Sequence, residues 1–224
     1  SSSPTSSVTG LSMGTNSFQW TITNGTCPPS IDTVNIILLP PTTIACAGPD
    51  QSLCNVTVST FAGNTPIVGS GVWTLIAGTG TITTPTSETS SVSNLSVGTN
   101  TFVWTITNGS CPPTTDTVNI IVYPLPTTAL AGPDQSLCAD STILNANIPT
   151  IGTGLWTLVS GTGTIANPNS PTTNVTGLSL GANTFQWAIT NGTCPPSLDT
   201  VLVFVNAPAT PAFAGSDQTV CEDS

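Results

Sequence analysis

Apolar and polar residues alternate along several short segments of this chain. In the segment 101–107, Phe102, Trp104 and Ile106 fall on one face, while Val103 and Thr105 fall on the other. A period of two residues is typical of a half-buried β-strand. The pattern recurs at Phe185, Trp187 and Ile189. We therefore predict a strand at both places, with the aromatic face in a core.

The segment that follows each of these strands has the same period. Its apolar positions are Val118, Ile120 and Val122, and later Val201, Val203 and Val205. The connections NGSCPP and NGTCPP are rich in Gly and Pro and suit a hairpin. Further strands are expected at 56–62, 71–78 and 90–98, and with the opening AGPDQSLC they make about seven per unit. The tryptophans predicted to be buried in the core are Trp20, Trp73, Trp104, Trp156 and Trp187.

The whole pattern repeats along the chain. Trp20, Trp104 and Trp187 are almost evenly spaced, and the AGPDQSLC block returns with the same spacing. A fixed period of about 84 residues indicates a tandem array. We predict a C-terminal half repeat at 1–40, complete repeats at 44–124 and 128–206, and the opening strand of a further repeat at 210–224. We interpret the chain as a segment of a longer array of such repeats.

Composition narrows the functional classes. The 224 residues include no Lys, Arg or His and ten acidic residues, so the formal charge is −10. Nucleic-acid binding needs cations that neutralise phosphates, and an anionic membrane surface repels such a chain. Neither partner is expected, and no apolar run is long enough to span a bilayer. Thr, Ser, Asn, Gly and Pro are the turn-forming and β-branched residues of an all-β protein.

Several motifs resemble a known family. The AGPDQ-x-x-C opening, the G-x-W-T-L strand, the GTGTI turn and the CPP-x-x-DTV hairpin resemble the PKD-like and Ig-like repeats of large Bacteroidota surface proteins. This resemblance implies tandem immunoglobulin-like β-sandwiches. It also implies an adhesin-like, gliding-associated protein that is exported by the type IX route, in which such repeats serve as spacers and stalks.

Each repeat carries two cysteines at fixed positions. One follows the opening strand and one lies in the last hairpin, and the candidates for disulfides are Cys27, Cys54, Cys111, Cys138, Cys194 and Cys221. Pairing within a repeat would join Cys54 to Cys111 and Cys138 to Cys194, although the two positions of each pair are expected at opposite ends of the sandwich. Pairing across a joint would join Cys54 to Cys194. Lateral bonds and free thiols are the remaining alternatives. Seven Cys without His ligands or the spacing of a metal site favour an oxidising compartment, so an exported protein is expected.

Other residues suggest chemistry more weakly. Asp50 and Asp134 recur in the opening block and are weak Ca²⁺ candidates, although turn capping by Asp is the simpler interpretation. Sequons begin at Asn55, Asn94 and Asn174 and at the glycosylation candidates Asn24, Asn108 and Asn191. The DTV tripeptide resembles a Bacteroidota O-glycosylation sequence. The DTV threonines are Thr33, Thr117 and Thr200.

The sequence thus predicts a structural protein that is not an enzyme and has no cofactor. No base such as His accompanies the cysteines. The leading hypothesis is a segment of an extracellular filament or cell-surface fibre, whose partners are other repeats or copies of itself. A stalk of a large adhesin is the alternative. A carbohydrate-binding module is a less favoured alternative. Such a module is expected to carry exposed aromatic residues that interrupt the repeat pattern, and none of these repeats does so.

Overall fold

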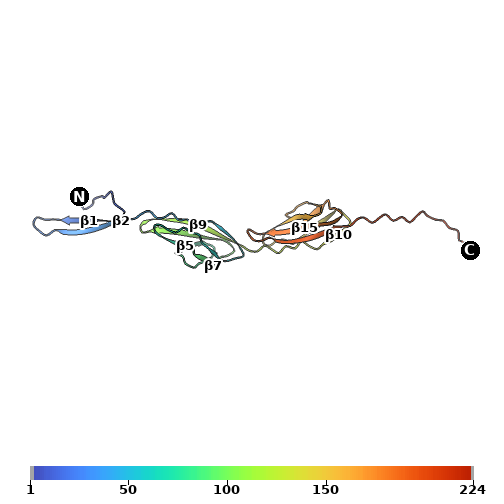
Figure 1. Cartoon of the computed structure of the whole chain (residues 1–224), viewed down its shortest axis with the longest axis horizontal. Helices are drawn as coiled ribbons and strands as arrows, with labels where there is room; N and C mark the ends of the chain where they lie inside the picture. Colours follow the sequence, from blue (N-terminus) through green and yellow to red (C-terminus); the bar gives the residue numbers. More distant parts are fainter. Residues whose placement is uncertain (1–2, 223–224) are drawn as a thin grey trace. The chain divides into compact units, whose positions relative to one another are not determined.

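The computed structural model describes residues 3–222 and divides the chain into two compact units, Ser1–Tyr123 and Pro124–Ser224 (Figure 1). Strands are the regular elements of both units, and the described residues contain no helix. No segment among them is therefore a helix able to cross a bilayer. The prediction of an all-β chain is confirmed.

The first unit begins with a hairpin of two long strands, β1 (Gly14–Ile22) and β2 (Ser30–Leu38). Seven strands follow in two sheets, ordered β3-β9-β8-β5 and β4-β7-β6. Their bounds are β3 (Gln51–Cys54), β4 (Ser59–Thr60), β5 (Ser70–Ala77), β6 (Thr81–Ile82), β7 (Ser91–Ser93), β8 (Gly98–Asn108) and β9 (Cys111–Tyr123).

The second unit has the same topology, with sheets β10-β16-β15-β12 and β11-β14-β13. Its strands are β10 (Gln135–Leu137), β11 (Ser141–Asn145), β12 (Thr153–Ser160), β13 (Thr164–Ile165), β14 (Thr172–Thr176), β15 (Gly181–Thr190) and β16 (Ser197–Val205). In both units the short opening strand runs parallel to the last strand, and the other pairs are antiparallel. Two sheets in this order form an immunoglobulin-like sandwich, as the sequence predicted.

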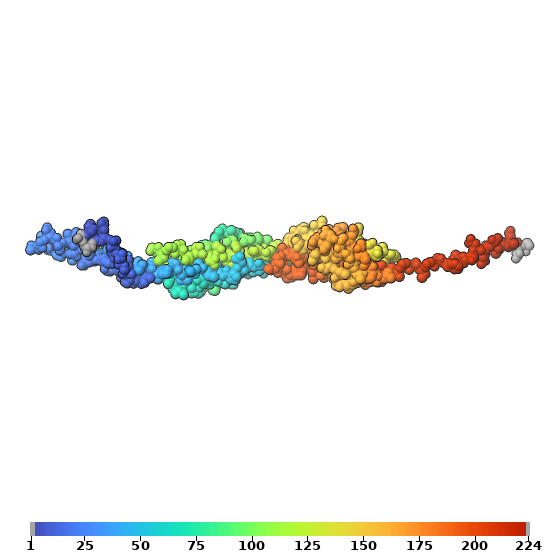
Figure 2. All heavy atoms as spheres, turned by 90° about the horizontal axis from the view of Figure 1, so that it is seen from above, coloured from blue at the N-terminus to red at the C-terminus, as the bar shows by residue number. Residues whose placement is uncertain are grey.

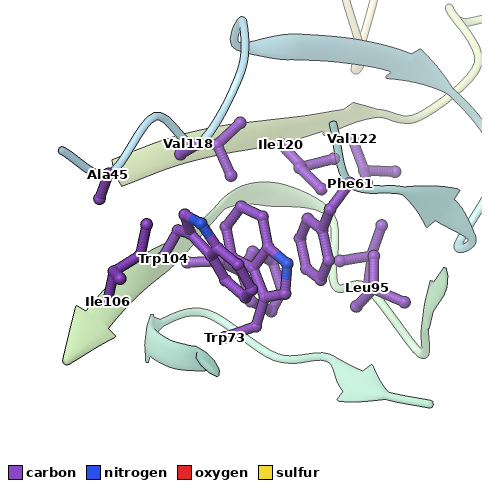
Figure 3. Close-up of a cluster of buried hydrophobic side chains, with 12 residues drawn as sticks. Ala45, Phe61, Trp73, Leu95, Trp104, Ile106, Val118, Ile120 and Val122 are labelled. Atoms are coloured by element: carbon purple, nitrogen blue, oxygen red, sulfur yellow. The ribbon is translucent and has the colours of Figure 1, made fainter. Parts of the chain in front are cut away.

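Aromatic residues fill the core between the two sheets (Figure 3). Trp73 on β5 packs against Trp104 on β8, with ring centroids 5.0 Å apart, and stacks on Phe61 at 4.1 Å. In the second unit, Trp156 and Trp187 lie 5.2 Å apart and are equally buried. These four tryptophans occupy the inward face that the alternation indicated.

Trp20 is the exception and corrects the prediction that every Trp is a core residue. Its side chain is 36% exposed, whereas the equivalent Trp104 and Trp187 are 0% exposed. The reason is that β1 and β2 form a two-stranded sheet, and no other described strand joins it. Alternation correctly marks the apolar face of this hairpin, but a second sheet is required to bury it.

The final segment is also irregular. Residues 207–222 contain no strand and are exposed throughout, as Figure 2 shows for the red end of the chain. The opening strand expected at 210–224 is thus not formed between 210 and 222, and positions 223 and 224 lie outside the described residues. In the complete repeats the same block pairs with the last strand, so the block needs that partner to become a strand.

A glycine gives one core tryptophan of each unit its space. A Cβ built on Gly71 would overlap the ring of Trp104, and one built on Gly154 would overlap the ring of Trp187. Both glycines lie directly beside the Trp pair, on β5 and β12. Because the rings are fully buried, they have no free volume into which they can move.

In each unit, one buried Asn side chain hydrogen-bonds the backbone near the start of the second-last strand, β8 or β15. Asn183 is 0% exposed, and its Nδ2 donates to the carbonyl oxygens of Ser179 at 2.8 Å and Gly181 at 3.2 Å. Its Oδ1 accepts from the Thr162 backbone N–H at 2.9 Å and from the Ser179 hydroxyl at 3.0 Å. Asn100 makes the equivalent bonds in the first unit. The side chain therefore ties β15 to the turn before it and to the turn after β12.

Substituting Gly154→Ala is expected to destabilise the second unit by about 1–3 kcal/mol, the usual effect of overpacking a close-packed core. The matched control is Ser160→Ala, an exposed position on the same strand, which is expected to stay within about 0.5 kcal/mol. Urea unfolding followed by tryptophan fluorescence measures both. Equal midpoints for the two variants would show that the ring is not confined.

Substituting Asn183→Asp keeps the acceptor but removes the donors and places a charge beside carbonyl oxygens. We expect the free energy of unfolding to fall by at least about 3 kcal/mol at pH 7, because a buried unpaired carboxylate is strongly unfavourable. The loss should shrink at pH 4, where the protonated carboxyl can donate one bond. Thermal unfolding at both pH values tests this, with the exposed Asn169→Asp as control. A pH-independent loss would contradict the assignment of Nδ2 as donor.

Candidate functional site: the linkers and the last hairpin

The segment that enters each repeat is hydrogen-bonded along its length to that repeat. Thr43 donates its N–H to the Val68 carbonyl at 3.2 Å, and its hydroxyl oxygen accepts the Val68 N–H at 2.8 Å. The Thr114 hydroxyl donates to the Thr43 carbonyl at 2.6 Å and accepts the Ala45 N–H at 3.0 Å. The segment is thus part of the folded repeat rather than a free tether.

The same bonds recur in the second unit. Thr127 makes the equivalent pair of contacts with Ile151, and Ala129 donates to the Ser197 hydroxyl at 2.8 Å. An Asn side chain adds two more bonds to each segment, since Asn64 and Asn147 both accept a backbone N–H and donate to a carbonyl. Sequence reasoning missed these two residues, although their recurrence at equivalent positions of the two repeats could have revealed them.

Carboxylates complete the contact between the opening block and the last strand. Asp116 accepts the Ala47 N–H at 2.7 Å, and Asp50 accepts the Asn119 N–H at 2.8 Å. Asp199 and Asp134 make the equivalent bonds in the second unit. Each carboxylate thus binds a backbone donor on the neighbouring segment.

This geometry bears on the weak Ca²⁺ prediction for Asp50 and Asp134. Among the described residues, no group of three or more His, Cys, Asp or Glu side chains gathers where it could hold a metal ion. Both carboxylates already accept backbone hydrogen bonds. Their capping role accounts for their recurrence, and calcium binding stays a prediction.

The loop of the last hairpin contacts the residue that follows the preceding repeat. In the first unit, Asn108 donates its Nδ2 to the Pro40 carbonyl at 2.8 Å, and the Cys111 Sγ lies 3.5 Å from the same oxygen. In the second unit, Asn191 donates to the Pro124 carbonyl at 2.7 Å, and the Cys194 Sγ lies 3.4 Å from it. The linker is therefore bound at its first proline as well as along its later residues.

The seven cysteines divide into two groups. Cys54 and Cys194 are disulfide-bonded. The remaining ones, Cys27, Cys46, Cys111, Cys138 and Cys221, are free. The alternative of bridges within a repeat, Cys54 to Cys111 and Cys138 to Cys194, is therefore wrong. The physical reason is that Cys54 pairs with Tyr123 at the end of β9, while Cys111 begins that 13-residue strand.

The glycosylation candidates differ in accessibility. Thr33, Thr117 and Thr200 are exposed on the last strands, and Asn24 is exposed in a loop. Asn108 and Asn191 instead use their side-chain amides to bind the linker prolines, so a glycan there would replace an N–H of that contact. Modification of all six stays a prediction.

The described surface also has an open hollow of about 540 Å³ beside β10 and β11. Its lining residues include Ala131, Pro133, Gln135, Thr142 and Ile143. No titratable side chain lines it. The hollow therefore offers no general acid or base.

No family model and no curated protein matches this chain. Among solved structures, the PKD domain from KIAA 1837 protein is 29% identical over 39% of this chain and 93% of that chain, with a TM-score of 0.34. Murine CEACAM1b is 15% identical over 70% and 96%, with a TM-score of 0.49. The immunoglobulin domains 1–4 of Sidekick-1 are 13% identical over 79% and 55%, with a TM-score of 0.48. Because these scores are below 0.5, the fold assignment depends on the strand order within each unit.

Proposed function

We propose that this chain is a structural repeat segment of an extracellular filament or cell-surface fibre. The observation that carries the proposal is the bound linker. Each entering segment is hydrogen-bonded from its first proline to its opening strand, and the same residue types make these bonds in both units. A segment bound in this way is part of the folded repeat itself, which suits a structural repeat of an array.

The surfaces of the two complete repeats support the same proposal. A recognition module generally presents a local departure from its scaffold, such as exposed aromatic or charged groups on loops. Here the tryptophans of the complete repeats are buried, and the carboxylates of the opening block cap backbone amides. A spacer therefore fits these repeats better than a carbohydrate-binding module, and no residue set is proposed for catalysis.

The disulfide chemistry supports an extracellular location. Disulfides persist in oxidising compartments and are rare in the cytosol. With Cys54 and Cys194 bonded, and no Lys or Arg available to trypsin-like proteases, the chain suits a long-lived structure outside the cell. Its proposed partners are other repeats or other copies of itself.

Immunogold electron microscopy of material sheared from the source cells tests this function, with antibodies raised against residues 44–206. We expect label along filaments of constant width, with an axial period of one or a few repeats. One repeat is on the order of 40 Å, because strands of up to about 12 residues rise about 3.3 Å per residue.

Label on thin flexible strings that end in a distinct head would instead support the adhesin stalk and contradict the filament. A non-binding antibody of the same isotype is the control. Label restricted to the cytoplasm would contradict both assignments.

A further inference from the structure

The loop of each last hairpin carries an asparagine that is followed by a glycine. The three pairs are Asn24–Gly25, Asn108–Gly109 and Asn191–Gly192. In such a pair the glycine has no side chain to shield its backbone nitrogen, which can attack Cγ of the preceding asparagine and close a succinimide ring. Each of these loops therefore contains a residue pair that is able to modify itself.

The first and the third pair have the same local sequence and the same backbone turn. Both lie in the segment ITNGTCPPS, at 22–30 and at 189–197. Their glycines have φ of 57° and 54°. In both turns the asparagine carbonyl accepts the N–H of the cysteine three positions later, at 3.1 Å. A difference in reactivity between Asn24 and Asn191 must therefore come from the contacts of their side chains.

These side-chain contacts differ. Asn191 is half-buried, and its Nδ2 donates to the Pro124 carbonyl oxygen at 2.7 Å. Asn108 makes the equivalent bond to the Pro40 carbonyl oxygen at 2.8 Å. Asn24 is exposed, and its side chain makes no hydrogen bond within residues 3–222. Two of the three amides are therefore held by the proline that begins the linker, and one is not.

The bond to proline opposes ring closure in two ways. The side chain must rotate until Cγ reaches the glycine nitrogen, and Nδ2 is the group that leaves. A held amide must therefore first give up its hydrogen bond, which slows the reaction by about twofold to tenfold. We infer that Asn24 is a site of spontaneous deamidation, and that the contact with the linker proline protects Asn108 and Asn191 from the same reaction.

The reaction consumes only water. The glycine nitrogen forms a bond to Cγ, the bond from Cγ to Nδ2 breaks, and Nδ2 leaves as ammonia with the proton of the glycine N–H. Water then opens the ring at either carbonyl carbon, which gives aspartate or isoaspartate. No atom is oxidised or reduced, so neither an oxidant nor an enzyme is required. This conclusion holds equally for a filament and for a stalk.

Deamidation of Asn191 removes the contact that protects it. An ionised aspartate accepts hydrogen bonds but donates none, so its carboxylate cannot bind the Pro124 carbonyl oxygen. The chain has no Lys, Arg or His to balance the new charge. The linker then keeps only its later bonds, such as that from the Thr127 N–H to the Ile151 carbonyl at 3.1 Å. The first contact of the linker thus lasts only as long as the amide.

Peptide mapping of the unchanged chain after ageing tests the inference. The folded protein is kept in mildly alkaline buffer, then reduced, alkylated and cleaved with chymotrypsin. The three pairs then lie in separate fragments, 21–38, 105–130 and 188–198. Mass spectrometry measures the conversion of amide to acid at each asparagine over time. We expect Asn24 to convert at least about twofold faster than Asn108 and Asn191.

The same chain, reduced and unfolded in guanidinium chloride, is the control. There the identical segments around Asn24 and Asn191 should convert at equal rates. Equal rates in the folded chain, or no conversion of Asn24, would overturn the inference. A difference that persists after unfolding would overturn it as well, because the proline contact would then not be the cause.

The variant Asn191→Asp tests the consequence, because it introduces the product directly. Asn24→Asp adds the same charge to the matched turn, where the side chain has no such contact, and is the control. We expect the Thr127 amide hydrogen to exchange at least about twofold faster in Asn191→Asp than in Asn24→Asp, as measured by NMR. Equal exchange in the two variants would show that the proline contact does not hold the linker.

Discussion

The pairing of the first and last strands of each repeat is the contact on which the rest of the structure depends. β3 runs parallel to β9, and β10 runs parallel to β16. Carboxylates reinforce the contact, since Asp116 and Asp199 bind the backbone of the opening block. The pairing brings the entry and exit of the repeat into one sheet. Residues 207–222 show the converse, because the same block without a last strand forms no strand.

This closure also determines how the linker is held. The chain that enters a repeat must follow the last hairpin before it reaches the opening strand, and the Asn and Cys side chains of that hairpin contact its first proline. In a chain without Lys, Arg or His, salt bridges between side chains cannot contribute. Neutral hydrogen bonds and carboxylate-to-backbone bonds take their place. The stability of the contact between each linker and its repeat should therefore depend little on ionic strength.

Much of the fold could be predicted from the sequence because its strongest signals are periodic. The alternation of apolar and polar positions indicated the buried faces of β8, β9, β15 and β16, and the regular recurrence of the motifs indicated the repeats. Trp20 was misassigned because alternation identifies an apolar face and says nothing of a covering sheet. The opening strands β3 and β10 are too short to show a period, so their parallel pairing was not predicted. Cysteine spacing alone left several pairings open, and the free Cys111 and Cys138 removed one of them.

The central claim is that the entering segment belongs to the folded repeat. Amide hydrogen exchange measured by NMR tests it most directly. The account predicts that the amides of Thr127, Ala129 and Ala131, each bonded to the second unit, exchange as slowly as those of β16. Residues 210–222 should exchange rapidly and serve as the internal standard for an unfolded segment. If the amides of 127–131 exchange as fast as that standard, the linker is a free tether and the account is wrong.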